Sequence, residues 1–291
     1  MLHPQARAAL ERTAAETPVH HPDFDVAAER AAAREAALAE PREDVASATD
    51  EVVGGVPCRR YVPLGDPSVL PGVVVHLHGG GFVMNDVEVH DAVSRMLANR
   101  SGLEVLSVDY RRPPEDRFPA AVEDVLAVVA ALPPEVPLFL HGDSAGANLA
   151  LVAALRNPGR ATALGLVYPF LDPRGDRPSY DEPEVAGSRA VMEWYWQQYA
   201  ATDADREHPD MAPLLSDALG TLPPTLVVTA EHDPLRDEGE ELVVRLADAG
   251  VSVVGTRYQG QVHGFWRHPS VFDAAEPLTG QMGAFLRQHA R

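Results

Sequence analysis

Residues 140–148 read LHGDSAGAN and place a serine between two glycines at the end of an apolar run. The run before Gly142 is predicted to be a strand and the segment from Ser144 a helix, so Gly142-x-Ser144-x-Gly146 occupies a sharp strand-to-helix turn. Such a turn exposes the serine hydroxyl, and the N–H of Ala145 at the helix N-terminus is available to a developing oxyanion. The alternative is an ordinary Gly-rich turn whose serine only caps the helix.

Apolar runs alternate with helical patterns along most of the chain. A hairpin is predicted at residues 52–63, with its turn at Gly54-Gly55. Because strands that are apolar on both faces and separated by helices form parallel sheets, the sequence predicts an α/β fold with a mainly parallel central sheet and helices on both faces. Strands are expected at 72–78, 103–110, 137–142, 163–169, 225–231 and 251–258, and helices near 90–101, 119–132, 144–156, 236–249 and 272–289.

Two segments interrupt this alternation. Residues 1–45 contain two Ala-rich helical patterns, broken at 17–25 and ended by Pro41, and residues 172–215 are charged and Pro-rich around an aromatic helix at 188–199. We expect both segments to form a cap over the C-terminal edge of the sheet, where α/β proteins keep their sites. The predicted division is 1–45 (N-terminal helices of the cap), 46–171 (first part of the core), 172–215 (cap insertion) and 216–291 (second part of the core).

Composition excludes several classes of function. The net charge is −19 and all 24 basic residues are Arg, so we expect no nucleic acid and no membrane as a partner, because both attract clustered cations. No apolar stretch approaches the roughly 20 residues of a membrane span, and no secretory signal is readable, so a cytoplasmic location is expected. Cys58 is the single cysteine and is predicted to be buried.

A second motif, HLHGGGFVMND at 76–86, follows the first long parallel strand. Successive glycines let backbone N–H groups point into a cleft without obstruction by side chains, which a second oxyanion donor requires. A phosphate-binding loop is the alternative, but neither G-x-G-x-x-G nor G-x-x-x-x-G-K-[ST] occurs and the chain contains no Lys. We expect His78 to shape this loop through a hydrogen bond.

The base and the acid that orients it are expected after two later strands. Asp233 lies in AEHDPLRDEGEE (230–241) and His263 in YQGQVHGFW (258–266). This gives the chain order Ser, Asp, His that the turn type uses. Asp233 is predicted to fix the tautomer of His263, which takes the proton from Ser144 and returns it to the leaving group.

Twelve histidines raise the alternative of a metal site. His76 and His78 share one face of a strand, whereas His20, His21 and His208 lie in the predicted cap segments, and no H-E-x-x-H occurs. We therefore expect no metal and no cofactor.

Together the motifs resemble the hormone-sensitive-lipase-like family of α/β-hydrolase esterases. They are HGGGF (78–82), DYRRPPEDRFPAAVEDV (109–125), GDSAGAN (142–148), EHDPLRDEGE (231–240) and VHGF (262–265), and they cover about residues 50–290 in family order. The resemblance implies an α/β-hydrolase fold with a helical cap. It also implies a catalytic triad of Ser144, Asp233 and His263 and an oxyanion hole made by the N–H groups of Gly80, Gly81 and Ala145.

Three further positions bear on the resemblance. Asp143 marks the subgroup whose turn reads Gly-Asp-Ser-Ala-Gly, and its implied role is to tie the turn to nearby loops. The chain departs from the family at residues 112–115, which read RPPE where Leu-Ala-Pro-Glu is usual, and at Ala147, where Gly is frequent. Neither departure touches the predicted chemistry.

The aromatic helix of the predicted cap has two interpretations. It places Met192, Tyr195 and Tyr199 on one face, flanked by two tryptophans, which is typical of core packing. In the other interpretation, bulky side chains line an acyl or alcohol pocket. The predicted pocket residues are Phe82, Trp194, Trp196 and Trp266.

The predicted function is therefore a serine carboxylesterase acting on a small-molecule ester with a small to medium acyl group, such as an acetylated specialised metabolite. A lactonase, amidase or thioesterase would use the same residues. A non-catalytic receptor on the same fold is disfavoured because His263 is present. Whether the chain forms a homodimer is left open.

Overall fold

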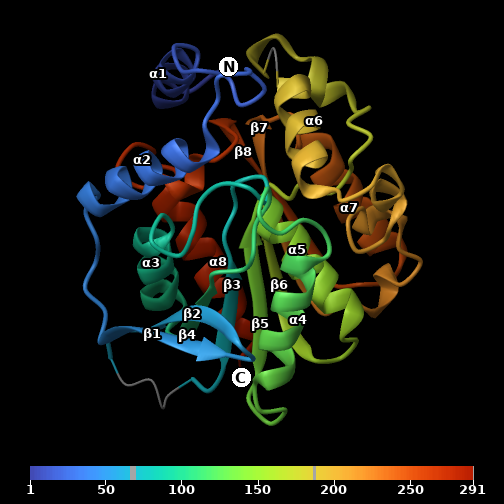
Figure 1. Cartoon of the computed structure of the whole chain (residues 1–291). Coiled ribbons are helices and arrows are strands. Elements are labelled where there is room, and N and C mark those ends of the chain that lie inside the picture. Colours follow the sequence, from blue (N-terminus) through green and yellow to red (C-terminus); the bar gives the residue numbers. More distant parts are fainter. Residues whose placement is uncertain (66–69, 186–187, 291) are drawn as a thin grey trace.

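The computed structural model describes residues 1–65, 70–185 and 188–290, and its centre is one eight-stranded sheet (Figure 1). The strand order is β1-β2-β4-β3-β5-β6-β7-β8, with antiparallel pairing at β1-β2 and β2-β4 and parallel pairing elsewhere. This confirms the predicted mainly parallel sheet. The strands are β1 (Ser47–Val53), β2 (Val56–Val62), β3 (Val73–Leu77), β4 (Glu104–Val108), β5 (Leu138–Asp143), β6 (Ala161–Val167), β7 (Thr225–His232) and β8 (Val253–Val262).

Helices cover both faces of the sheet, as predicted. α3 and α8 contribute to the apolar core on one face, and α4, α5 and α7 contribute to the core on the other. The α-helices are α1 (Pro4–Thr13), α2 (Val26–Ala39), α3 (Asp91–Ser101), α4 (Ala120–Ala131), α5 (Ala145–Arg156), α6 (Ser188–Tyr199), α7 (Arg236–Asp248) and α8 (Ala275–His289). The 3-10 segments are η2 (Pro178–Asp181), η3 (Pro183–Val185), η4 (Asp203–Glu207), η5 (Pro213–Leu215), η6 (Leu219–Thr221) and η7 (Phe265–Arg267).

The first hairpin differs from its prediction in length. Its turn lies at Gly54-Gly55, where φ is 60° and 86°, as a tight hairpin turn requires. However, β1 begins at Ser47 rather than at residue 52, because SATDEVV forms an edge strand whose mostly exposed residues lack an apolar alternation. Cys58 on β2 is buried, as predicted.

The predicted cap segments lie above the carboxyl ends of the strands, with α1 and α2 on one side and α6 on the other (Figure 1). Phe24, between α1 and α2, packs edge-on against Trp194 of α6 with ring centroids 5.7 Å apart, so the N-terminal segment contacts the insertion. Residues 186–187 of the insertion lie outside the described residues. The division into core and cap segments stays a prediction, and this contact supports it. No helix in the described ranges is long and apolar enough to cross a membrane.

Candidate active site

Ser144 stands at the turn between β5 and α5, as predicted. Its φ of 54° and ψ of −120° are unusual for a residue with a side chain, and such strain persists where surrounding structure enforces it. The Ser144 N–H donates to the carbonyl of Val167 at 2.8 Å. A Cβ on Gly146 would overlap the Leu77 carbonyl, so only glycine lets α5 begin this close to the end of β3.

The fold brings together the three residues predicted as the triad. His263 Nε2 lies 3.0 Å from Ser144 Oγ, and His263 Nδ1 lies 2.9 Å from Asp233 Oδ2. The other Asp233 oxygen accepts the Leu235 N–H at 2.8 Å, and the carboxylate is fully buried. The ring of Tyr168 packs against that of His263, with the two centroids 4.7 Å apart. The arrangement allows His263 to accept the serine proton while Asp233 stabilises the resulting imidazolium.

The electrostatics of His263 follow from the same contacts. Burial alone would lower the pKa of His263, but the charge and hydrogen bond of Asp233 outweigh burial and raise this pKa above its ordinary value of 6.5. A raised pKa makes the imidazole a better proton acceptor, yet it also keeps the ring protonated at mildly acidic pH.

The predicted oxyanion donors surround the serine turn. Gly80 and Gly81 have φ of 123° and 58°, and neither N–H makes a hydrogen bond to another described residue. Ala145 is the first residue of α5, and its N–H belongs to the first turn, which lacks intrahelical partners. Their assignment as the oxyanion hole stays a prediction, which this backbone geometry supports.

Hydrogen bonds from neighbouring segments hold the glycine loop. The Tyr110 hydroxyl donates to the His78 carbonyl at 2.6 Å, and the Asn85 amide donates to the Gly79 carbonyl at 3.0 Å. His78 Nδ1 lies 3.0 Å from the same Gly79 oxygen, consistent with the shaping role expected for it. Sequence reasoning missed Asn85, which belongs to no short motif that names a chemical role.

Asp143 links this loop to the serine turn. Its Oδ1 accepts the Gly79 N–H at 2.9 Å and lies 3.2 Å from His90 Nε2, and all three residues are in the interior. Burial would raise the pKa of Asp143, but the neighbouring His90 lowers it well below its ordinary range. Asp143 was expected to tie the serine turn to nearby loops, and the residue it binds in the glycine loop is Gly79. His90 also contacts Asp143, which the sequence did not indicate.

Three of the four predicted pocket residues are almost completely buried, and Trp194 is half-buried. Phe82 and Trp196 are almost completely buried and pack together, with centroids 5.4 Å apart, in an aromatic cluster with Phe170 and Tyr199. Trp266 is also fully buried, and its indole donates to Thr279 of α8 at 2.9 Å. Trp266 therefore packs in the core beneath α8, and its assignment to a substrate pocket stays a prediction that this placement does not support.

Two neighbouring residues of α6, Trp194 and Tyr195, are half-buried, and one of them contacts the predicted oxyanion loop. Trp194 contacts Phe24, and the ring of Tyr195 lies directly against Gly81, where a Cβ on that glycine would overlap it. Sequence reasoning placed Tyr195 on the packing face of the helix and among the bulky side chains of the pocket interpretation, but did not list it as a predicted pocket residue. The contact makes Tyr195 the cap side chain that borders the loop.

Two groups in the described ranges have three possible metal-ligand atoms within 4.8 Å of one another. One comprises His76, His90 and Asp143, and the other Glu182, Glu184 and His232. In the first group, Asp143 already accepts the Gly79 N–H and His76 Nδ1 lies 2.9 Å from His141 Nδ1. One oxygen of Asp143 and one ring nitrogen of His76 are thus engaged in protein contacts, whereas His76 Nε2 and both ring nitrogens of His232 have no hydrogen-bond partner among the described residues.

The sheet, the serine turn and the hydrogen-bonded Ser-His-Asp set define an α/β hydrolase. A family model described as alpha/beta hydrolase fold matches residues 74–267, and the chain belongs to this family, which comprises the hormone-sensitive-lipase-like carboxylesterases. An ethyl acetate hydrolase of Pseudomonas putida is 33% identical over 251 residues, covering 80% of this chain and 79% of the relative. An arylesterase of Saccharolobus solfataricus is 34% identical over 246 residues, with the same coverages of 80% and 79%. The solved structure of an esterase from Pyrobaculum calidifontis is 34% identical, with a TM-score of 0.87 and coverage of 100% and 99%.

The raised pKa of His263 predicts the acid limb of the activity profile. Since only the neutral imidazole accepts the serine proton, kcat/KM should fall as pH decreases, with a midpoint above 6.5. Asp233→Asn should move this midpoint to lower pH and reduce kcat on the order of 10⁴-fold. Exposed Asp248, replaced by Asn, is the matched control. An acid limb that stays in place in Asp233→Asn would contradict this account of His263.

The link between Asp143 and Gly79 predicts a positioning role. Asp143→Asn keeps an oxygen for the Gly79 N–H but removes the charge beside His90, so we expect kcat to fall about ten-fold, since hydrogen bonds to charged groups contribute about 1.5–3 kcal/mol. KM should change little, because Asp143 is almost completely buried and is not exposed to a bound substrate. Steady-state kinetics with thermal unfolding as the folding control test this, and an unchanged kcat would refute it.

Proposed function

We propose that the chain is a serine carboxylesterase that hydrolyses small to medium acyl esters through Ser144, His263 and Asp233. The observation that carries the proposal is the continuous set of hydrogen bonds from Ser144 Oγ to His263 Nε2 at 3.0 Å and from His263 Nδ1 to Asp233 at 2.9 Å. The esterase names of the relatives support the same class of reaction.

In the acylation step, His263 Nε2 takes the Ser144 proton while Oγ attacks the ester carbonyl. The carbonyl oxygen becomes an oxyanion, to which the N–H groups of Gly80, Gly81 and Ala145 donate. The intermediate collapses as His263 returns the proton to the departing alcohol. Water then attacks the acyl-enzyme with His263 again as base, which releases the acid and restores Ser144.

The cap supports a preference for small and medium acyl groups. Tyr195 lies against Gly81, so a bulky ring already occupies the space beside the proposed oxyanion hole. A relative named for ethyl acetate hydrolysis is consistent with a short acyl group. Deacetylation of a specialised metabolite is one such reaction, and lactones, amides and thioesters remain alternatives with the same machinery. A cytoplasmic location and a homodimer stay predictions.

Ser144→Ala tests the nucleophile. We expect the variant to fold and to lose on the order of 10⁶-fold in kcat, because the triad acts as a unit. A fluorophosphonate should label the parent protein at Ser144 alone, as judged by peptide mapping. Parent-like hydrolysis by folded Ser144→Ala would refute the mechanism, and an EDTA-sensitive rate that zinc restores would support the metal alternative.

Acyl-length preference tests the cap. Tyr195→Ala and Trp194→Ala should shift the optimum to longer acyl chains more than they lower the rate on acetyl esters, since each buried methylene contributes about 0.8 kcal/mol. Trp196→Ala should instead destabilise the fold by about 3–5 kcal/mol, because Trp196 is in the aromatic cluster. Acetyl to dodecanoyl p-nitrophenyl esters measure the profile, with exposed Gln197→Ala as control. An unchanged profile in both half-buried variants would contradict a pocket beside Tyr195.

A further inference from the structure

Three side chains with metal-binding atoms meet where the predicted cap insertion reaches the end of β7. One ligand atom of each of Glu182, Glu184 and His232 lies within 4.8 Å of the other two. Glu182 lies between η2 and η3, Glu184 belongs to η3, and His232 is the last residue of β7. None of the three belongs to the proposed triad.

His232 is the side chain that points to a ligand. It is 8% exposed, and both of its ring nitrogens are buried without a hydrogen-bond partner in the described ranges. Its Nε2 lies 3.4 Å from Glu231 Oε2 without the geometry of a hydrogen bond, and its Nδ1 makes no ion pair with a described residue. A buried polar group without a partner costs free energy, and a metal ion is a partner that a neutral imidazole readily accepts.

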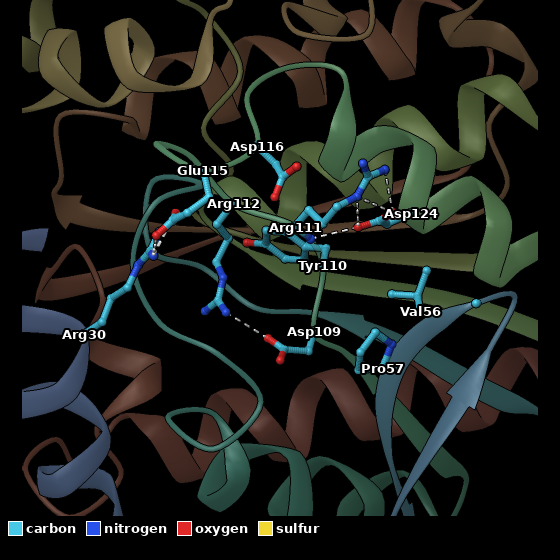
Figure 2. A pocket seen from close by; sticks show the side chains of 11 residues that line it. Arg30, Val56, Pro57, Asp109, Tyr110, Arg111, Arg112, Glu115, Asp116 and Asp124 are labelled. Atoms are coloured by element: carbon cyan, nitrogen blue, oxygen red, sulfur yellow. Dashed lines mark hydrogen bonds and ion pairs between the residues drawn. The ribbon is translucent and has the colours of Figure 1, made fainter. Parts of the chain in front are cut away.

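The Glu184 carboxylate is available to an ion. Many acidic side chains of this protein are paired with arginine, as in the pocket of Figure 2, where Arg111 binds Asp124. Glu184 differs, because it is exposed and makes no hydrogen bond or ion pair with the residues that the structure describes. No existing contact therefore has to break before Glu184 turns toward His232.

Glu182 is half-buried and already has a cationic partner. Its Oε1 lies 2.8 Å from Nη2 of Arg236, which also pairs with Asp237 at 2.8 Å. An ionised carboxylate has about four acceptor positions, so Glu182 can keep Arg236 and still bind a metal ion. Because Asp237 balances the charge of Arg236, the arginine leaves the site with the negative charge of its two glutamates.

We propose that Glu182, Glu184 and His232 bind a divalent transition-metal ion of the zinc type, with water completing its coordination. One imidazole nitrogen and two carboxylates form a mixed set that suits zinc, whereas Ca²⁺ and Mg²⁺ prefer oxygen ligands alone. The ligand atoms of a zinc site lie closer together than 4.8 Å. Exposed Glu184 can close this distance by a change of rotamer, while buried His232 stays in place.

The ion joins the predicted cap insertion to the strand that leads into the triad. His232 directly precedes Asp233 in the chain. The two segments already lie together, because Ser179 of η2 donates its hydroxyl proton to the Pro234 carbonyl at 2.6 Å. We therefore expect the ion to stabilise the docked insertion and to take no part in the ester chemistry, because none of its ligands belongs to the proposed triad.

Calorimetric titration of EDTA-treated protein with Zn²⁺ tests the site. Zinc should show a saturable one-to-one phase, and Ca²⁺ and Mg²⁺ should not. The titration is repeated on His263→Ala, so that zinc bound at the proposed triad is recognised and the outcome does not depend on esterase activity. Binding that is lost in folded His263→Ala would overturn the proposal, as would the absence of a saturable phase or equal binding of Ca²⁺.

Variants locate the ion. Glu184→Gln and His232→Gln should each weaken zinc binding by more than about ten-fold, since even the loss of a residue that only supports a ligand costs about 10–100-fold. Glu184 is exposed, so its variant keeps the test valid if His232→Gln fails to fold. The matched controls for adventitious zinc are Glu135→Gln and His21→Gln, which change exposed residues elsewhere. Affinity that falls equally in the controls, or that stays unchanged in Glu184→Gln, would overturn the proposal.

Thermal unfolding tests the stabilising role. Zinc at about 100 times its Kd should raise the Tm of the parent protein by about 5 °C and leave the Tm of Glu184→Gln nearly unchanged. The kcat for ester hydrolysis at 25 °C should be equal in zinc-loaded and EDTA-treated parent protein. Saturated binding with an unchanged Tm, or a kcat that EDTA abolishes, would refute the role given to the ion.

Discussion

The close approach of α5 to the end of β3 is the constraint on which the rest of the site depends. Because Gly146 has no side chain, the helix begins against the carbonyl of Leu77. This contact places the N-terminus of α5 beside the glycine loop that follows β3, and it fixes Ser144 in a backbone conformation that an unsupported turn would not adopt. The nucleophile and the proposed oxyanion donors are therefore brought together by backbone packing, before any catalytic side chain is involved.

Two buried carboxylates then act on this framework in different ways. Asp233 is at the end of β7 and pairs with a histidine that reaches Ser144, so its charge changes the proton affinity of the base. Asp143 precedes Ser144 directly and pairs with His90 and the Gly79 N–H, so its charge holds a loop. Both carboxylates need a partner because burial of an unpaired charge costs several kcal/mol. The partner of each carboxylate therefore decides its role. Asp233, paired with His263, serves the proposed proton transfer, whereas Asp143, paired with His90 and Gly79, positions a loop.

Sequence alone predicted the sheet, the helices and the three triad positions, because periodicity, glycine spacing and chain order follow from local chemistry. It did not predict β1 in full, since an exposed edge strand carries no apolar alternation. It assigned Trp266 to the pocket, although that ring turns beneath α8. It also missed His90 and Asn85, whose roles arise from contacts with other segments of the chain. Such contacts depend on how helices dock, which a single sequence does not encode locally.

The segment after β4 shows how one stretch of chain serves two surfaces. The Tyr110 hydroxyl donates to the carbonyl of His78 in the glycine loop, and Tyr110 also lines, with Asp109 and Arg112, a pocket that contains none of the triad residues. Residues 112–115, which read RPPE, belong to this segment, and Arg112 and Glu115 line the pocket. Arg112 binds both Asp109 and the Asn85 carbonyl, and the Asn85 amide donates to Gly79, so one side chain links the segment after β4 to a residue that holds the glycine loop. The segment after β4 thus supports the glycine loop through Tyr110 and Arg112, while the proposed ester chemistry is carried by other residues.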